Sequence, residues 1–226
     1  MKPVAELINN VEPGWTLVQQ WIDEATNTVE ILPADEGRAS EALYQTQVTT
    51  RSPMGAIIHA TGGLLVDHGW IRILGSGSDR LNRTLPGWNM GKTFSQFGEA
   101  PPYLLVADDV IGGLWAINGG ALGNDTGNLY YLSPDALEWE ETDLNYSEFL
   151  HFCFSGDTEG FYEAFRWDGW EEEVAALDGN QVFNFFPFLW TKEGQEDINT
   201  LSRKLVPIEE SYNLYMDTKH ELDGEE

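Results

Sequence analysis

The first thirty residues have the hydrophobic spacing of a helix. After Pro13-Gly14, apolar residues recur every three or four positions, which is the spacing of one buried helical stripe: Trp15, Val18, Trp21, Ile22 and Ala25. This predicts an N-terminal helical segment within residues 1–30, ended near Ile31-Leu32-Pro33 because the residue before a proline disfavours helical backbone. A second short helix is predicted over residues 39–45.

Residues 47–141 change to short apolar runs bounded by glycine, which predicts hairpin-linked strands. The expected runs are 56–58, 63–66, 70–74, 103–107, 114–117, 129–132 and 137–140. In the last run Leu137 and Trp139 share one face while Glu138 and Glu140 share the other, as in an antiparallel sheet with one solvated face. Residues 78–102 lack such periodicity and are expected to form a long surface loop.

Helical spacing returns at Asn145, where Glu148 stands three positions later and predicts a capping box. Short helices are predicted around residues 161–165 and 171–177, and a last one over 207–222, so residues 145–222 read as a helical segment with short irregular stretches. No ten-residue helical pattern separates the strands, which disfavours a parallel sheet. The prediction is one α+β domain over residues 1–226, with a mainly antiparallel, twisted sheet flanked by N- and C-terminal helices.

The composition supports a folded protein. Hydrophobic residues make up 42% of the 226 residues and nine are Trp, so a large core can form and a disordered chain is excluded. No apolar run approaches the ~20 residues that span a bilayer. The opening MKPVAELINN lacks the apolar region of a secretory signal, and a single Cys cannot form an internal disulfide. These features predict a cytoplasmic protein without a membrane partner.

The charge is strongly acidic, with 38 Asp plus Glu against 12 Lys plus Arg and a net charge of −26. Such a chain repels phosphate backbones, so nucleic-acid binding is not expected. Residues 135–173 hold thirteen acids and one cation, Arg166. The candidate partner surface comprises Glu138, Glu140, Glu141, Asp157, Glu159, Trp167, Asp168, Trp170, Glu171 and Glu172. One interpretation of this surface is a binding site for a basic protein partner, such as a toxin. The other, given equal weight, is a solvated acidic face that binds no partner.

A second candidate site is a small-molecule pocket that begins at Asp67-His68, after an apparent strand. Its candidate residues are Asp67, His68, Arg72, Arg80, Asp108 and Asp109. A histidine beside an acid at a turn is more often structural than catalytic. No pair of His residues has metal-ligand spacing, so no metal is predicted. No set of catalytic residues is complete, so no cofactor is predicted and an enzyme is disfavoured.

Several longer motifs stand out along the chain: QVTTRSP (47–53), TGGLLVDHGW (61–70), LGSG (74–77), LPGWN (85–89), VADD (106–109), NGGALG (118–123), and FY (161–162) with RW (166–167). Together they resemble a bacterial family, the domain of unknown function numbered 2625. The resemblance covers nearly the whole length, and it implies a fold lineage without implying an activity.

A second set of features follows a fixed order: LP at 32–33, a glycine pair, a short strand ending at Gly75, then LYYL (129–132), LEW (137–139) and YSEFL (146–150). This order is similar to that of a more distant group, the SUKH superfamily. Many members of that group are α+β immunity proteins that neutralise partner toxins, and others are scaffold-like regulators. This chain departs from the pattern by an insertion at 78–102 and an extra segment after residue 180.

The leading hypothesis is a non-enzymatic protein-binding module of the toxin-immunity type. The alternative is a small-molecule binder or enzyme with a pocket around Asp67, His68 and Arg72. A third possibility, a DNA mimic, predicts binding to basic nucleic-acid proteins in general, although nine Trp and many glycine turns favour a compact sheet over a rod-like mimic. The sequence makes no prediction of the oligomeric state.

Overall fold

Seven strands form one antiparallel sheet in which every strand pairs with the next along the chain. The computed structural model describes residues 1–224. The strands are β1 (Val29–Leu32), β2 (Gly63–Val66), β3 (Ile71–Leu74), β4 (Tyr103–Asp109), β5 (Leu114–Asn118), β6 (Asn128–Leu132) and β7 (Trp139–Asn145). This confirms the predicted α+β fold with a mainly antiparallel sheet.

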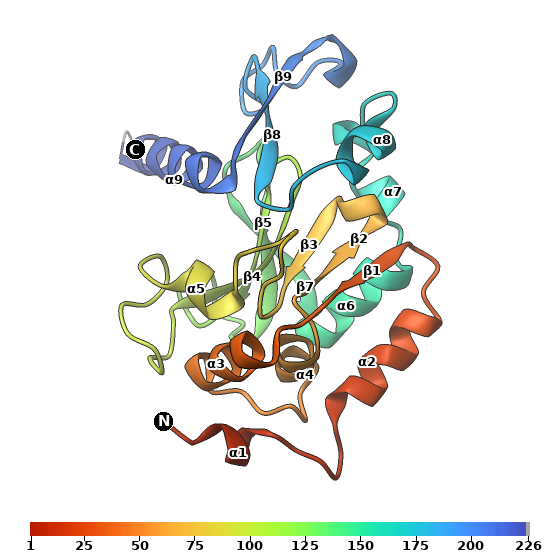
Figure 1. The fold of residues 1–226 in the computed structure, drawn as a ribbon. Coiled ribbons are helices and arrows are strands. Elements are labelled where there is room, and N and C mark those ends of the chain that lie inside the picture. The colour runs from red at the N-terminus through yellow and green to blue at the C-terminus, as the bar shows by residue number, and fades with distance from the viewer. Residues whose placement is uncertain (225–226) are drawn as a thin grey trace.

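Helices from the N-terminal half lie on one side of the sheet, below it in Figure 1. They are α1 (Val4–Leu7), α2 (Gly14–Asp23), α3 (Glu36–Thr46) and α4 (Pro53–Ala60). Helix α6 (Tyr146–Ser155) contacts α2 and α4 and joins this layer. Helix α6 begins with the predicted capping box, since Asn145 Oδ1 accepts from the Glu148 amide at 3.2 Å and the Asn145 amide donates to the Glu148 carboxylate at 2.8 Å.

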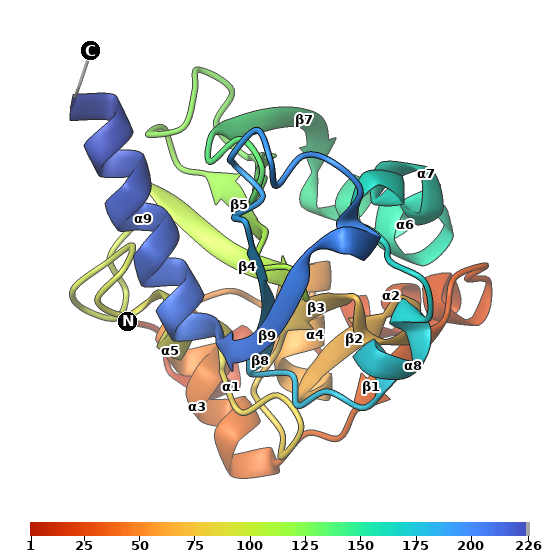
Figure 2. The same cartoon turned by 90° about the horizontal axis from the view of Figure 1, so that it is seen from above.

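The C-terminal residues form a hairpin and a helix on the opposite side of the sheet (Figures 1 and 2). The elements are β8 (Gln181–Phe186), η3 (Ile198–Thr200), β9 (Ser202–Pro207) and α9 (Ile208–Gly224). The last helix was predicted, but the hairpin was not, because residues 145–222 were expected to be helical. The hairpin forms because Phe183 and Phe185 are buried against the Trp167 ring, at centroid distances of 4.8 and 5.7 Å.

The remaining short helices connect these layers. They are η1 (Asp67–Gly69), α5 (Leu85–Asn89), α7 (Thr158–Phe161), η2 (Glu163–Phe165) and α8 (Trp170–Ala175). The predicted helical turns around residues 161–165 and 171–177 are confirmed. Within residues 1–224, no helix combines the length and the continuous apolar character needed to cross a bilayer.

The predicted strand at residues 56–58 is wrong, because this run lies inside α4. Ser52 Oγ caps the helix by accepting from the Gly55 amide at 3.1 Å, and Pro53 occupies the first turn. A Cβ at Gly55 would lie 2.1 Å from the Thr49 carbonyl oxygen, so only glycine permits this close approach.

Three further boundaries differ from the sequence predictions. The segment expected to end the first helix is strand β1, paired with β2. The loop expected at 78–102 contains α5 and buries Leu81, Leu85 and Trp88. The strand expected at 137–140 is β7, which starts at Trp139, since Leu137 adopts a left-handed φ of 56° in the preceding turn.

Candidate functional site

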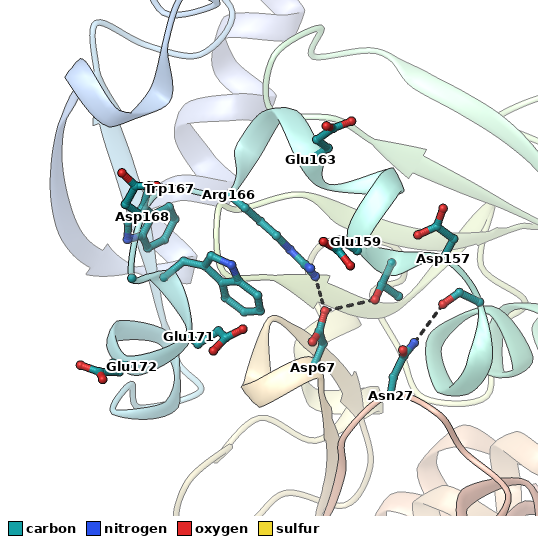
Figure 3. Close-up of a pocket in the computed structure, with 14 residues that line it drawn as sticks. Asn27, Asp67, Asp157, Glu159, Glu163, Arg166, Trp167, Asp168, Glu171 and Glu172 are labelled. Carbon is teal, nitrogen blue, oxygen red and sulfur yellow. Dashed lines mark hydrogen bonds and ion pairs between the residues drawn. The ribbon is translucent and has the colours of Figure 1, made fainter.

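A large cavity lies where α7, η2 and α8 pass over η1, and Figure 3 shows its lining. Its volume is about 720 Å³. Seven of the fourteen lining residues are acidic and one, Arg166, is cationic. The acidic residues are Asp67, Asp157, Glu159, Glu163, Asp168, Glu171 and Glu172. We call this cavity the acidic pocket.

Arg166 is held inside the acidic pocket by one carboxylate and three aromatic rings, the farthest of which is Tyr162 at 6.0 Å. Its Nη2 donates to Asp67 Oδ2, to which Thr158 Oγ1 also donates at 3.1 Å. The guanidinium carbon lies 4.3 Å from the Trp170 ring centroid and 5.2 Å from that of Trp70. Cation–π contacts of this kind add to the ion pair. Arg166 therefore neutralises Asp67 and is not free to neutralise the other acids.

Six carboxylates of the acidic pocket remain without an ion-pair partner among the described residues. All six are exposed, and four of them, Asp157, Glu159, Glu171 and Glu172, lie on α7, on α8 and in the turn before α7. Carboxylates gathered in one concave wall create a negative potential that attracts cations. Across residues 1–224, no group of three or more His, Cys, Asp or Glu residues has an arrangement that could hold a metal ion.

Comparison with known proteins identifies the family. The model of the family described as "Protein of unknown function DUF2625" matches residues 4–211. The chain belongs to this family. It is 44% identical over 223 residues to an uncharacterised protein of Haemophilus influenzae, covering 99% of this chain and 97% of that protein. It is also 42% identical over 219 residues to the uncharacterised protein YbfG of Escherichia coli strain K12, covering 97% of this chain and 98% of that protein. No solved structure matches.

In this DUF2625 protein the predicted partner surface divides into two regions. Seven of its ten residues, from Asp157 to Glu172, line the acidic pocket. Glu138, Glu140 and Glu141 lie elsewhere, in β7 and the turn before it at the edge of the sheet. Trp167 lines the acidic pocket but is only 1% exposed and belongs to the core, whereas Trp170 is half-buried at the pocket wall. Trp170 is therefore the accessible aromatic residue of this site.

The six residues of the predicted small-molecule pocket do not line one cavity. Asp67 lines the acidic pocket, while His68 is exposed on the other side of η1, 5.9 Å from the Trp170 ring. His68 and Arg80 line a separate cavity of about 230 Å³, where Arg80 forms an ion pair with Glu30 at 2.7 Å. Only Asp67 therefore contributes to the acidic pocket.

Arg72, Asp108 and Asp109 lie together in the core between the sheet and the C-terminal hairpin. Arg72 Nε donates to Asp108 Oδ1 at 2.6 Å, and Arg72 Nη1 donates to the Gln181 carbonyl at 2.5 Å. Arg83 Nη1 donates to Asp108 Oδ2 at 2.5 Å. Two guanidinium groups thus share one fully buried carboxylate, and we call Arg72, Arg83 and Asp108 the buried arginine cluster.

Asp109 gives the protein a pH-dependent stability. Burial raises the pKa of its carboxyl to about 6, against the opposing hydrogen bonds from Tyr131 and Gly113. The folded protein then binds the proton more tightly than the unfolded chain, whose Asp pKa is about 3.9. This contribution to stability is present below pH 4 and is lost as pH rises through 6. From pH 5 to pH 8 we expect the wild type to lose about 1 kcal/mol relative to Asp109→Asn, measured by urea unfolding. Parallel pH profiles would contradict this assignment.

Proposed function

We propose that this protein is a non-enzymatic, cytoplasmic binding module that receives a basic segment of a partner protein in the acidic pocket. The observation that carries the proposal is the cavity of about 720 Å³ with seven acids, of which only Asp67 is neutralised by Arg166. A cationic side chain 4 Å from one such carboxylate gains about 1 kcal/mol in water and about 4 kcal/mol at an effective dielectric constant near 20. Several carboxylates acting together favour a segment with more than one Lys or Arg.

Trp170 supports the same occupant. Its ring already receives one guanidinium, that of Arg166, at 4.3 Å. The side chain is half-buried beside Asp168 and Glu171, so part of its surface remains open to a partner. Aromatic residues at the centre of an interface supply much of its binding energy, while surrounding charges mainly set the association rate.

The toxin-immunity type is the finer part of the proposal, and its support is the similarity in element order to the SUKH superfamily. The partner would then be a basic toxin. The alternative, a small-molecule pocket formed by Asp67, His68 and Arg72, has less support. Asp67 faces the acidic pocket, His68 faces a different cavity, and Arg72 is buried in the core.

The test is the affinity of a fluorescently labelled octa-arginine peptide in low and high salt. The pocket variant carries Asp157→Asn, Glu159→Gln, Glu171→Gln and Glu172→Gln, all at exposed positions. We expect this variant to bind the peptide about 10- to 100-fold more weakly at low salt, because the favourable potential is lost. Salt is expected to weaken wild-type binding and to reduce the difference between the two proteins.

A charge-matched control separates the pocket from the overall net charge. Glu6→Gln, Glu36→Gln, Glu193→Gln and Glu196→Gln remove the same four charges from exposed positions outside the acidic pocket. This control is expected to bind the peptide within about threefold of the wild type. Equal loss in both variants would show that only net charge matters and would overturn the proposal. An affinity capture that uses the wild type and the pocket variant as baits then identifies the partner.

A further inference from the structure

A second cavity, of about 450 Å³, lies beside α5 and the start of α9. Figures 1 and 2 place the β8–β9 hairpin between α9 and α8, so this cavity and the acidic pocket lie on different sides of the hairpin. Its principal lining residues are Arg83, Trp88, Lys92, Pro207, Ile208 and Glu209. Two of them are cations and one is an acid, the reverse of the chain as a whole, where acids outnumber cations 38 to 12. We call it the cationic cavity.

Lys92 is fixed in this cavity by aromatic rings. Its Nζ lies 4.1 Å from the Trp88 ring centroid and 5.2 Å from that of Tyr212. It also lies 3.0 Å from both carboxylate oxygens of Glu209. The Lys92 side chain is only 12% exposed, whereas that of Glu209 is 55% exposed. The ammonium group is therefore held in place, while Glu209 is able to rotate away into solvent.

Two buried donors in the same lining have no acceptor within residues 1–224. They are Arg83 Nε and Trp88 Nε1. The other two nitrogens of the Arg83 guanidinium donate to Asp108 and, at 2.9 Å, to the Gly179 carbonyl oxygen. The side chains of Arg83 and Trp88 are 9% and 4% exposed. A buried donor without an acceptor is unfavourable, so an acceptor oxygen brought within reach of these two atoms would relieve that cost.

We propose that the cationic cavity binds a small organic anion, whose carboxylate or phosphate group pairs with Lys92 and accepts from Arg83 and Trp88. The apolar part of the ligand contacts Pro207 and Ile208. In the free protein Glu209 forms an ion pair with Lys92, so its carboxylate competes with the ligand for the Lys92 ammonium group. This site is independent of the proposed protein-binding function, which uses the acidic pocket.

Calorimetric titration of the full-length protein with phenyl phosphate, benzoate and benzamide tests this proposal. Benzamide has the shape of benzoate without its charge. We expect at least one of the two anions to bind saturably with a Kd at or below about 1 mM, and benzamide to bind at least tenfold more weakly. Tighter binding of phenyl phosphate identifies a phosphate ligand, and tighter binding of benzoate identifies a carboxylate ligand. No saturable binding of either anion, or equal binding of benzamide, overturns the proposal.

Two substitutions with opposite expected effects locate the site. Lys92→Gln is expected to weaken anion binding at least tenfold, whereas Glu209→Gln is expected to strengthen it severalfold because the competing carboxylate is removed. Lys192→Gln, an exposed control outside the cavity, is expected to leave the Kd unchanged. The bound anion is also expected to shift the indole N–H resonance of Trp88, assigned with Trp88→Phe. Anion binding that is unaffected by both Lys92→Gln and Glu209→Gln overturns the assignment to this cavity.

Discussion

Replacing Asp108 with asparagine is expected to lower the free energy of unfolding by about 3 to 5 kcal/mol, because it leaves two buried guanidinium groups without their shared carboxylate. Arg72 and Arg83 are 1% and 9% exposed, and Asp108 is fully buried. Arg72 still reaches the carbonyl oxygens of Asp109 and Gln181, but neither carries a full negative charge. Urea unfolding followed by tryptophan fluorescence measures the effect.

Asp79→Asn is the matched control for this substitution, because Asp79 is exposed. Its free energy of unfolding is expected to stay within about 0.5 kcal/mol of the wild type. A loss below about 1 kcal/mol in Asp108→Asn would mean that the buried arginine cluster does not depend on its carboxylate. The Asp109 carboxylate nearby would then be the group that compensates the two arginines.

The association rate of a basic partner is expected to fall about 10- to 100-fold when the acidic pocket is neutralised. Charges that steer an approaching partner act mainly on the association rate, whereas close contacts act mainly on dissociation. Stopped-flow mixing of octa-arginine with the pocket variant at low salt measures this rate. The dissociation rate is expected to change less than the association rate.

Trp170→Ala provides the complementary change. It removes the half-buried ring from the pocket wall while retaining every carboxylate. We expect faster dissociation of the peptide with little change in its association rate. If the pocket variant altered only the dissociation rate, long-range steering would be excluded and direct contacts would account for the binding.

The strands were largely predictable because glycine-bounded apolar runs are a local signal. Helix α4 was not, because a helix buried on every side has no polar face, and three apolar residues at 56–58 fit a strand equally well. The β8–β9 hairpin was missed for a different reason. Phe183 and Phe185 are buried by Trp167 and the sheet. Because this contact joins distant segments, the spacing of hydrophobic residues along residues 181–207 does not reveal it.

The acidic pocket was predictable only in part. Asp157, Glu159, Glu171 and Glu172 are close in sequence, so their common location follows from the short α7 and α8. The pairing of Asp67 with Arg166 joins residues 99 positions apart. A signal for it existed, since Arg166 is the only cation among the thirteen acids at 135–173. That Glu138, Glu140 and Glu141 lie apart from this pocket, in β7 and the turn before it, is visible only in the folded structure.

The order of the strands has a consequence for synthesis on the ribosome. Because each strand pairs with its neighbour along the chain, residues 29–145 can complete the sheet before the rest of the chain has emerged. The hydrogen bond from Arg72 to the Gln181 carbonyl spans 109 positions and must form later. Ribosomes stalled just before residue 181 are therefore expected to carry a nascent chain in which the sheet has formed. The face of the sheet that the C-terminal hairpin later covers is still exposed to solvent, and this makes the nascent chain a substrate for chaperones.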